Sequence, residues 1–145
     1  MEECFHLGVK ALIPNHEGKL LLLQSDDKSW DIPGGRIHKN ESLEAALRRE
    51  VYEETGLNTI SRIVFFKLAL SSRRIFTPSG NVGLILATHL CHCRDVNQIQ
   101  LSDEHISFGW FEPREAAERL SSNFPDELTV AIAGLQQTAS LQISR

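Results

Sequence analysis

Apolar residues lie along the chain in short runs that are separated by turn-forming residues. Two such runs, residues 5–13 and 19–24, flank the segment PNHEG, whose proline, asparagine and glycine favour a turn. This pattern predicts a β-hairpin near the start of the chain. Further strands, with a turn at TPSGN between the first two, are expected at residues 59–70, 82–93 and 106–111.

Caps and helix-breaking residues predict three helices. The first follows a short strand around Arg36 and Ile37, has Asn40 or Ser42 as its cap and stops at Gly56. The other two are expected at residues 113–120 and 126–137. Since strands precede and follow a central helix, we expect an α+β fold in which helices cover both faces of a mixed sheet. No linker is visible, so residues 1–145 are expected to form a single domain.

The central helix carries carboxylates on its apolar side. At about 100° per residue, and with Leu43 as zero, Leu47 falls at about 40° and Val51 at about 80°. Glu50 and Glu54 fall at about −20° and 20°, inside this apolar stripe. The residues expected on the opposite face are Arg48, Tyr52 and Thr55. Carboxylates turned toward a core are costly unless they are protonated, paired with cations or bound to a metal.

The spacing of these carboxylates favours a role in metal binding over the alternative that they are solvated charges of an ordinary surface helix. Glu50 and Glu54 are like charges four residues apart, which costs roughly 0.2–0.5 kcal/mol unless a positive charge lies between them. All-oxygen ligands suit a hard cation such as Mg²⁺ or Mn²⁺ rather than zinc.

Composition restricts the class of partner. The 145 residues carry a net charge of −4 with a pI near 5.8, so there is no basic field of the kind that binds nucleic-acid polymers. The first residues, MEECFHLG, do not resemble a signal peptide, and no apolar run approaches the roughly 20 residues that span a bilayer. Three cysteines do not form a disulfide framework. We expect a cytoplasmic protein without membrane association.

One segment of the chain, from Gly35 to Leu57, reads GRIHKNESLEAALRREVYEETGL. It matches the Nudix box, G-x5-E-x7-R-E-U-x-E-E-x-G-U with U an aliphatic residue, at every specified position. The chain therefore resembles the Nudix hydrolases, and the α/β/α sandwich of that family has the element order expected here. Gly35, which opens the box, is included among the metal-binding candidates.

The resemblance implies roles for the charged residues of the box. Glu50 and Glu54 would hold a divalent metal, and Glu53 would be a further ligand or the base for the attacking water. Arg49 would orient the carboxylates of the box, with Glu41 as its partner. Family members hydrolyse a pyrophosphate linkage in a nucleoside diphosphate joined to a group X, using bound Mg²⁺ to neutralise the charge on the phosphates. Mg²⁺, or alternatively Mn²⁺, and a small nucleotide substrate are thus implied.

Residues outside the box narrow the substrate class. The proline that marks the ADP-ribose group and the tyrosine that marks dinucleoside polyphosphate enzymes are both absent beyond the box. The stretch WDIPGGRI resembles the corresponding part of MutT-like nucleoside triphosphate pyrophosphohydrolases. We favour that class. An ADP-ribose or nucleotide-sugar pyrophosphatase is one alternative, and a non-catalytic nucleotide-binding module is another. Either a monomer or a homodimer is compatible with the sequence.

Further candidates lie outside the box. Trp30 could stack on a base or anchor the loop before the box, and Arg73 and Arg74 could meet substrate phosphates or end a solvated strand. Nudix proteins often have an acidic residue ahead of a strand containing Trp. Glu104, which is separated from Trp110 by five residues, fits this position and is a candidate metal ligand or base.

Several cysteines and histidines are expected to have structural roles rather than to bind a metal. His89, Cys91 and Cys93 alternate along a predicted strand and would face one side, but a structural zinc site needs four ligands, so packing is favoured. For His38 and His105 we expect surface positions.

Overall fold

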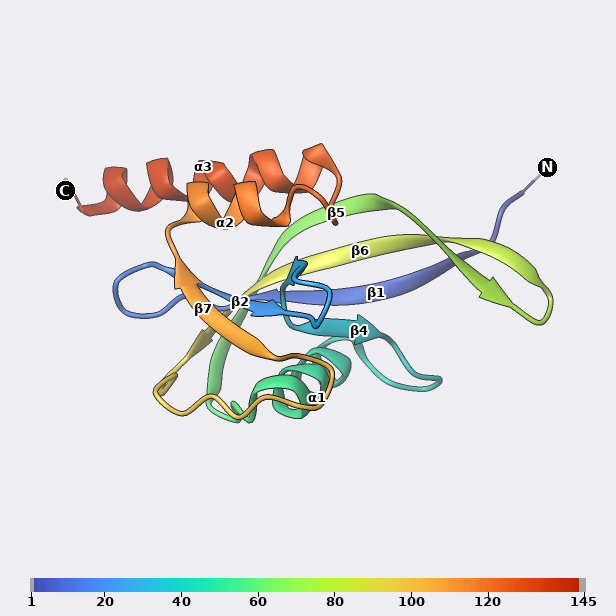
Figure 1. Ribbon diagram of the computed structural model, residues 1–145, viewed down its shortest axis with the longest axis horizontal. Coiled ribbons are helices and arrows are strands. Elements are labelled where there is room, and N and C mark those ends of the chain that lie inside the picture. The colour runs from blue at the N-terminus through green and yellow to red at the C-terminus, as the bar shows by residue number, and fades with distance from the viewer. Residues whose placement is uncertain (1, 144–145) are drawn as a thin grey trace.

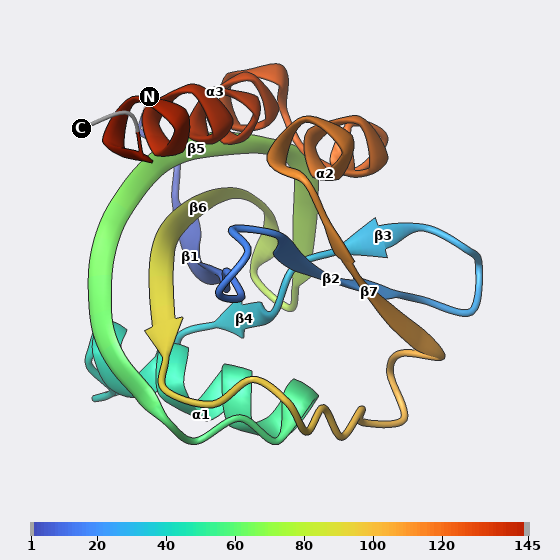
Figure 2. The same ribbon diagram turned by 90° about the vertical axis from the view of Figure 1, so that its left-hand side faces the viewer.

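The computed structural model describes the backbone of residues 2–143 and the side chains of residues 2–135. Two β-sheets lie between one helix on one side and two helices on the other, as Figures 1 and 2 show. This arrangement confirms the expected α+β sandwich. The N-terminal strand extends toward the end of the molecule opposite the C-terminal helix (Figure 1).

The secondary structure contains the expected elements and one short additional strand. The strands are β1 (Phe5–Leu12), β2 (Leu20–Gln24), β3 (Trp30–Asp31), β4 (Gly34–Arg36), β5 (Ile60–Thr77), β6 (Gly80–Cys93) and β7 (Ser107–Phe111). The helices are α1 (Leu43–Thr55), α2 (Pro113–Leu120) and α3 (Asp126–Ile143). The short strand β3 is the element that periodicity did not predict, because two residues carry no detectable pattern.

The strands form one mixed and one antiparallel sheet. The first has the order β4-β1-β6-β5, with β1 parallel to β6, and the second has the order β3-β2-β7. The predicted hairpin of β1 and β2 is therefore wrong. The turn is present, but the two strands share only the bridge between Pro14 and Leu20. Each strand already has a neighbour on both edges, so neither edge is free for a hairpin.

Two hydrophobic cores flank the strands. Leu21 and Leu23 of β2 belong to the core under α1, whereas Leu20 and Leu22 belong to the core under α2 and α3. All four are buried. This is why the run is continuously apolar: a strand covered on both faces shows no alternation of apolar and polar residues.

The hairpin of β5 and β6 is longer than the apolar pattern indicated. The strands continue in register from Arg74 opposite Gly83 to Thr77 opposite Gly80. Most side chains in this outer part are exposed. The polar residues Ser71, Ser72 and Arg73 fall in an irregularity of the ladder, and backbone pairing resumes at Arg74, since this pairing does not depend on side-chain polarity.

Helix α1 has the caps that the sequence predicts. The Ser42 hydroxyl accepts a hydrogen bond from the Ala45 amide at 3.1 Å, and Gly56 adopts the left-handed conformation with φ of 75°. Two face assignments are wrong. Leu43 is 41% exposed, because α1 packs on β4 and β1 and its first turn is left partly uncovered. Thr55 is buried, with its hydroxyl satisfied by the Val51 carbonyl at 2.6 Å.

Candidate active site

Glu50 and Glu54 face the backbone of the neighbouring strand β4. The Gly34 amide donates to Glu54 Oε2 at 3.4 Å. A Cβ atom added to Gly35 would lie 2.5 Å from Glu50 Oε1, so only glycine leaves room for that carboxylate. The helix and the two glycines therefore bring both carboxylates together, on the side of α1 that the sequence indicated.

Arg49 connects three carboxylates of the box. Its Nε and Nη2 donate to the two oxygens of Glu41 at 2.7 and 2.9 Å. Its Nη1 donates to Glu50 Oε1 at 2.8 Å and approaches Glu53 Oε2 at 3.4 Å. The hydrogen bonds from Arg49 hold the pKa of Glu41 at about 2. The expected pairing of Arg49 with Glu41 is present, and the guanidinium fixes the orientation of Glu50 as well.

Glu54 is the most deeply buried carboxylate of the helix, with 7% of its surface exposed. Its pKa is raised from 4.5 to about 8, chiefly by burial; the charge of Lys10 opposes this shift, and the charges of Asp31 and Glu50 contribute to it. A buried carboxylate without a full counter-charge is held in its neutral form by the cost of desolvation. Glu54 is thus the group whose ionised form gains most from a bound cation.

Lys10 is a functional candidate that sequence analysis missed. Its Nζ donates to Asp31 Oδ1 at 3.0 Å and to the Ile32 carbonyl at 3.3 Å, and its side chain is 13% exposed. The available signal was a single lysine inside the otherwise apolar strand FHLGVKAL. A charged residue within a strand that is buried on both sides needs a partner, and Asp31 supplies it.

A small cleft of about 90 Å³ opens on the face of the mixed sheet beneath α2 and α3. Its lining residues are Lys10, Asp31, Ser71, Arg73, Leu84, Leu86, Asn123 and Phe124. Arg73 reaches this cleft, and its Nη2 donates to Asn123 Oδ1 at 2.7 Å. The cleft combines two cations with apolar walls, and it shares Lys10 with the surroundings of Glu54.

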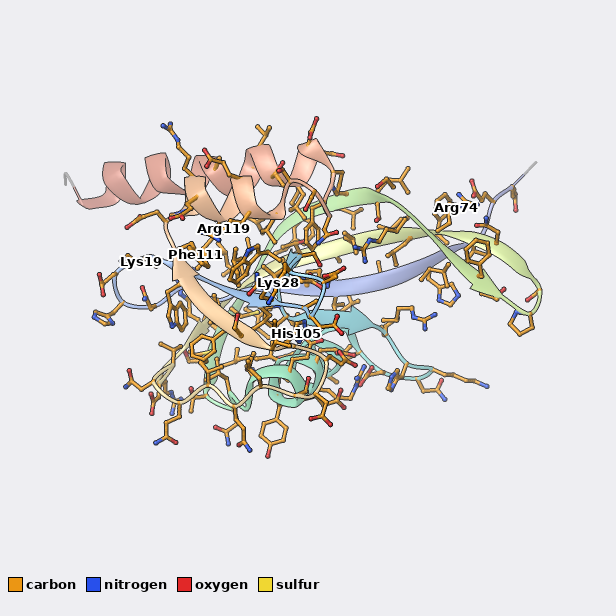
Figure 3. All side chains as sticks on the ribbon, viewed as in Figure 1. Lys19, Lys28, Arg74, His105, Phe111 and Arg119 are labelled. Carbon is orange, nitrogen blue, oxygen red and sulfur yellow. The ribbon has the colours of Figure 1, made fainter. Side chains whose placement is uncertain are left out.

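The two other predicted substrate-binding residues, Trp30 and Arg74, do not line this cleft. Trp30 packs edge-on against Phe111, with ring centroids 5.2 Å apart, and its carbonyl accepts from Asn123, so it anchors β3 against α2. Arg74 donates to Asn81 Oδ1 and pairs with Glu3 far along the hairpin, away from Phe111 and the other labelled central residues (Figure 3). The structure does not bring Arg74 to the cleft.

Glu104 lies in the loop of residues 94–106, which runs beside α1 in Figures 1 and 2. The loop is fixed to the end of the helix by the Gln100 amide, which donates to the Thr55 carbonyl at 2.8 Å. Glu104 is exposed, and within residues 2–135 its side chain has no hydrogen-bond partner. A role for Glu104 at the metal therefore stays a prediction.

His105 contradicts the expected surface position. Its ring is half-buried, and Nδ1 is shielded from solvent without a hydrogen-bond partner among the described side chains. Burial lowers the pKa of His105, and the charges of Asp31 and Glu104 partly offset this effect. The loop thus places His105 within electrostatic range of Asp31 and Lys10, two residues that line the cleft. His38 is exposed, as expected.

Of the three residues considered as zinc ligands, Cys91 and His89 are buried and pack against neighbouring side chains. Cys91 is fully buried in the core under α1, and burial raises the pKa of its thiol to about 12, so the thiol stays protonated. His89 stacks edge-on with Phe65 at a centroid distance of 5.6 Å. Over the described part of the chain, no three His, Cys, Asp or Glu side chains converge in an arrangement that could hold a metal.

Among the described residues, the carboxylates of α1 also do not form a cluster of three metal ligands. Glu53 is more than half exposed and turns toward Arg49, so it does not yet form a three-carboxylate cage with Glu50 and Glu54. The chemistry of the donors nevertheless fits a hard divalent cation. The Glu50 oxygens lie against Gly35, the Gly34 amide donates to Glu54 Oε2, and the buried Glu54 needs a compensating charge.

Comparison with known proteins identifies the family. The NUDIX domain family matches residues 5–130. A MutT-like protein of Streptomyces ambofaciens is 27% identical over 130 residues, covering 88% of this chain and 77% of the relative. A CTP pyrophosphohydrolase of Escherichia coli K12 is 31% identical over 118 residues, covering 77% and 80%. The crystal structure of a MutT protein from Methanosarcina mazei Go1 aligns with a TM-score of 0.71 and 25% identity, over 96% of this chain and 98% of that one.

The chain belongs to the NUDIX domain family, and it is a Nudix hydrolase. Enzymes of this family generally use divalent metal ions. Within residues 2–143, none of the helices combines the length and the apolar character that crossing a bilayer requires.

Proposed function

We propose that this Nudix hydrolase is a MutT-like nucleoside triphosphate pyrophosphohydrolase that depends on Mg²⁺ or Mn²⁺. The observation that carries the proposal is the pair of carboxylates, Glu50 and Glu54, held against Gly35 and Gly34. The nearby cleft is lined by the cations Lys10 and Arg73 and by the carboxylate of Asp31. The printed names of the relatives, a MutT-like protein and a CTP pyrophosphohydrolase, support the same class of reaction.

The metal would be held by the oxygens on one side of α1. Glu50 and Glu54 would be the first ligands, and the absence of a side chain at Gly35 leaves room for the Glu50 carboxylate. Glu53 becomes a third ligand or a base after its side chain leaves Arg49, a contact that is long and exposed. When bound, such an ion supplies positive charge to the phosphate oxygens and lowers the pKa of a coordinated water.

The protein itself holds the carboxylates and the phosphates in place. Arg49, fixed by Glu41, keeps Glu50 oriented without taking part in the chemistry. Lys10 and Arg73 present two cations in the cleft, and Lys10 lies near enough to Glu54 to affect the pKa of that carboxyl. Phosphate oxygens in that cleft would pair with these cations, and Lys10 would connect this phosphate site with the surroundings of Glu54.

A panel of substrates distinguishes a nucleoside triphosphate pyrophosphohydrolase from an ADP-ribose or nucleotide-sugar pyrophosphatase. Purified protein with Mg²⁺ is incubated with CTP, the four deoxynucleoside triphosphates, ADP-ribose and a nucleotide sugar, and the products are resolved by ion-exchange chromatography. The proposal predicts a monophosphate and pyrophosphate from at least one triphosphate. Cleavage of ADP-ribose or of the sugar nucleotide alone would replace the MutT-like assignment with the other substrate class.

A further inference from the structure

A groove that is separate from the active site opens between α1 and β5. Its volume is about 330 Å³, and its lining includes Leu43, Leu47 and Ile63. Leu47 and Ile63 also pack in the core under α1, so they give the groove an apolar floor. Leu43 at the rim is 41% exposed. An apolar hollow of this kind is suited to receive an apolar side chain.

The apolar surface continues from this groove along β5. Residues directly opposite one another in neighbouring strands share one side of a sheet. Two rows of this kind cross β5, β6 and β1, formed by Leu68, Ala87 and Val9 and by Leu70, Ile85 and Leu7. Val9 belongs to the core under α1, so Leu68 and Leu70 extend the same face outward. These two leucines are 52% and 56% exposed, and together with the groove they form a patch of the kind that marks an interaction surface.

Phe76 lies on the same face, in the outer part of the hairpin of β5 and β6. Its partner in the ladder is Asn81, and side chains an even number of positions apart on a strand share a face, so Asn81 lies on the side of Ile85 and Ala87. At 83%, Phe76 is the most exposed large apolar side chain within residues 2–135. Covering such a ring with another apolar surface is favourable.

The outer edge of β5 is available for pairing with another strand. The mixed sheet ends at β5, its outermost strand in Figure 2, so the outward backbone groups of β5 have no strand partner in the described part of the chain. From Lys67 to Leu70 the ladder is regular, and register shifts flank it. Exposed apolar edges are templates for strand addition, which an outward lysine opposes. Lys67 is instead turned toward Glu127 of α3, with Nζ and Oε1 3.5 Å apart.

Two β5 strands match one another when they run antiparallel about a two-fold axis at Ala69. Leu68 of one copy then lies opposite Leu70 of the other, and both are on the α1 face. Apolar side chains therefore meet, and no two charged residues are opposed within residues 67–71. An axis at Leu68 is unfavourable, because it would place Leu70 opposite Phe66, which packs against the core on the other face.

The axis at the middle of the regular segment also brings the exposed phenylalanine of one copy to the groove of the other. Phe76 and Ile63 are paired with Asn81 and Cys91 of β6. Both of these β6 residues lie five positions from Leu86, which is opposite the axis residue. Since the axis relates the two copies, Phe76 of one copy comes to lie beside Ile63 of the other. Ile63 forms part of the groove floor, so the groove receives the ring.

We propose that two copies of the chain form a dimer in which the β5 strands pair about an axis at Ala69 and Phe76 of each copy fills the groove of the other. The contact is isologous, since each copy gives one phenylalanine and receives one. At roughly 200 Å² for a whole side chain, the exposed parts of Leu43, Leu68, Leu70 and Phe76 amount to about 450 Å² per copy. A stable interface buries about 800 Å² per partner, of which a little more than half is apolar, so the face has the size that a dimer needs.

The test measures self-association of the full chain by analytical ultracentrifugation, up to millimolar protein. We expect a monomer that converts to a dimer as the concentration rises. Phe76→Gln and Leu70→Gln should each raise the dissociation constant of the dimer at least about tenfold, because each change removes apolar contact twice per dimer. Tyr52→Gln, which replaces a 59% exposed aromatic residue of α1, is the matched control and should associate like the wild type. All three side chains are more than half exposed, so each variant should melt like the wild type.

A second readout distinguishes strand pairing from other modes of association. Hydrogen exchange at the amides of residues 67–71 should slow as the concentration of the wild type rises, because outward amides gain partners across the axis. The ¹H–¹⁵N resonances of residues 43–48, beside the groove, should shift over the same range of concentration. Phe76→Gln should remove the shifts at residues 43–48.

Three outcomes would overturn the proposal. The first is a chain that stays monomeric at every concentration, which would assign the face to a partner of another sequence. The second is a dimer that Phe76→Gln and Leu70→Gln leave as tight as Tyr52→Gln does. The third is a dimer in which exchange at residues 67–71 is as fast as in the monomer, since the β5 strands would then be unpaired.

Discussion

Arg49 holds Glu41 with two hydrogen bonds, from Nε to Oε2 at 2.7 Å and from Nη2 to Oε1 at 2.9 Å. This fork leaves Nη1 pointing at Glu50, which it reaches at 2.8 Å. Glu41 therefore acts on the metal-binding carboxylates through Arg49, and it does so without approaching them itself. Such a pairing uses the planar, two-pronged geometry that lysine lacks.

Replacing Arg49 by lysine tests this orienting role. The variant keeps the charge and loses the fork, so kcat should fall by about tenfold to a hundredfold, as expected when a charged hydrogen bond of about 1.5–3 kcal/mol is lost. KM should change little. Arg48→Lys is the matched control, since Arg48 pairs with the exposed Glu44 on the outer side of the same helix. A variant of Arg49 with wild-type kcat would show that Glu50 needs no support.

The close approach of β4 to α1 leads to a second prediction. In Gly35→Ala, the new methyl group would lie 2.5 Å from the Glu50 carboxylate and must displace it. We expect kcat to fall by about a hundredfold, as for other displacements of about 1 Å at a reacting centre. Gly134→Ala is the control, because no atom lies within 4 Å of its new methyl group. That helical substitution should raise the free energy of unfolding by about 0.5–1 kcal/mol and leave kcat unchanged.

The raised pKa of Glu54 predicts how stability depends on pH in the absence of metal. Its value of about 8 exceeds the ordinary 4.5, so the folded state holds a proton that the unfolded state releases. The stabilisation is complete below about pH 4.5 and is lost as the pH rises toward about 8. In EDTA, the melting temperature of the wild type should therefore fall over this interval more steeply than that of Glu54→Gln.

Metal binding should reverse this effect, which gives a readout independent of activity. At about pH 8, Mg²⁺ should raise the melting temperature of the wild type and have a smaller effect on Glu54→Gln, because ligands that bind the folded state stabilise it. Glu44→Gln, an exposed carboxylate of the same helix, should respond to Mg²⁺ like the wild type. Equal responses of all three proteins would remove Glu54 from the metal site.

The general base is assigned by comparing Glu53 with Glu104. Glu53→Gln should lower kcat by about 10²–10⁴ while the thermal melting curve is preserved, if Glu53 activates the water. Glu104→Gln should lower kcat at least about tenfold, if the loop brings this residue to the metal. Asp103→Asn, next to Glu104 and also exposed, should have a much milder effect. A Glu104 variant with normal turnover would leave the helix carboxylates to act alone.

The sequence predicted those parts of the site that lie on one continuous segment. The caps of α1 and the inward direction of Glu50 and Glu54 follow from local spacing, and the pairing of Arg49 with Glu41 is what the resemblance to the Nudix family implied. Local periodicity is sufficient for Glu50 and Glu54, because residues four positions apart on a helix have fixed relative positions.

The remaining parts depend on contacts between distant segments. Lys10 and Asp31 are 21 positions apart, and they meet only because β1 and β3 belong to neighbouring sheets. The parallel pairing of β1 with β6, which replaces the predicted hairpin, likewise has no local signal. Arg73 and Arg74 are adjacent, yet Arg73 bonds Asn123 at the cleft and Arg74 bonds Asn81 on the hairpin, and the irregularity of β5 before Arg74 leaves no local signal for this difference.

The central claim is that the carboxylates of α1 act through a divalent ion on a nucleoside triphosphate. The measurement that tests it most directly is the release of pyrophosphate from the best triphosphate of the panel, first in excess EDTA and then after Mg²⁺ or Mn²⁺ is added in excess of the chelator. The account predicts no release in EDTA and full recovery with either ion. Undiminished turnover in excess EDTA would contradict it.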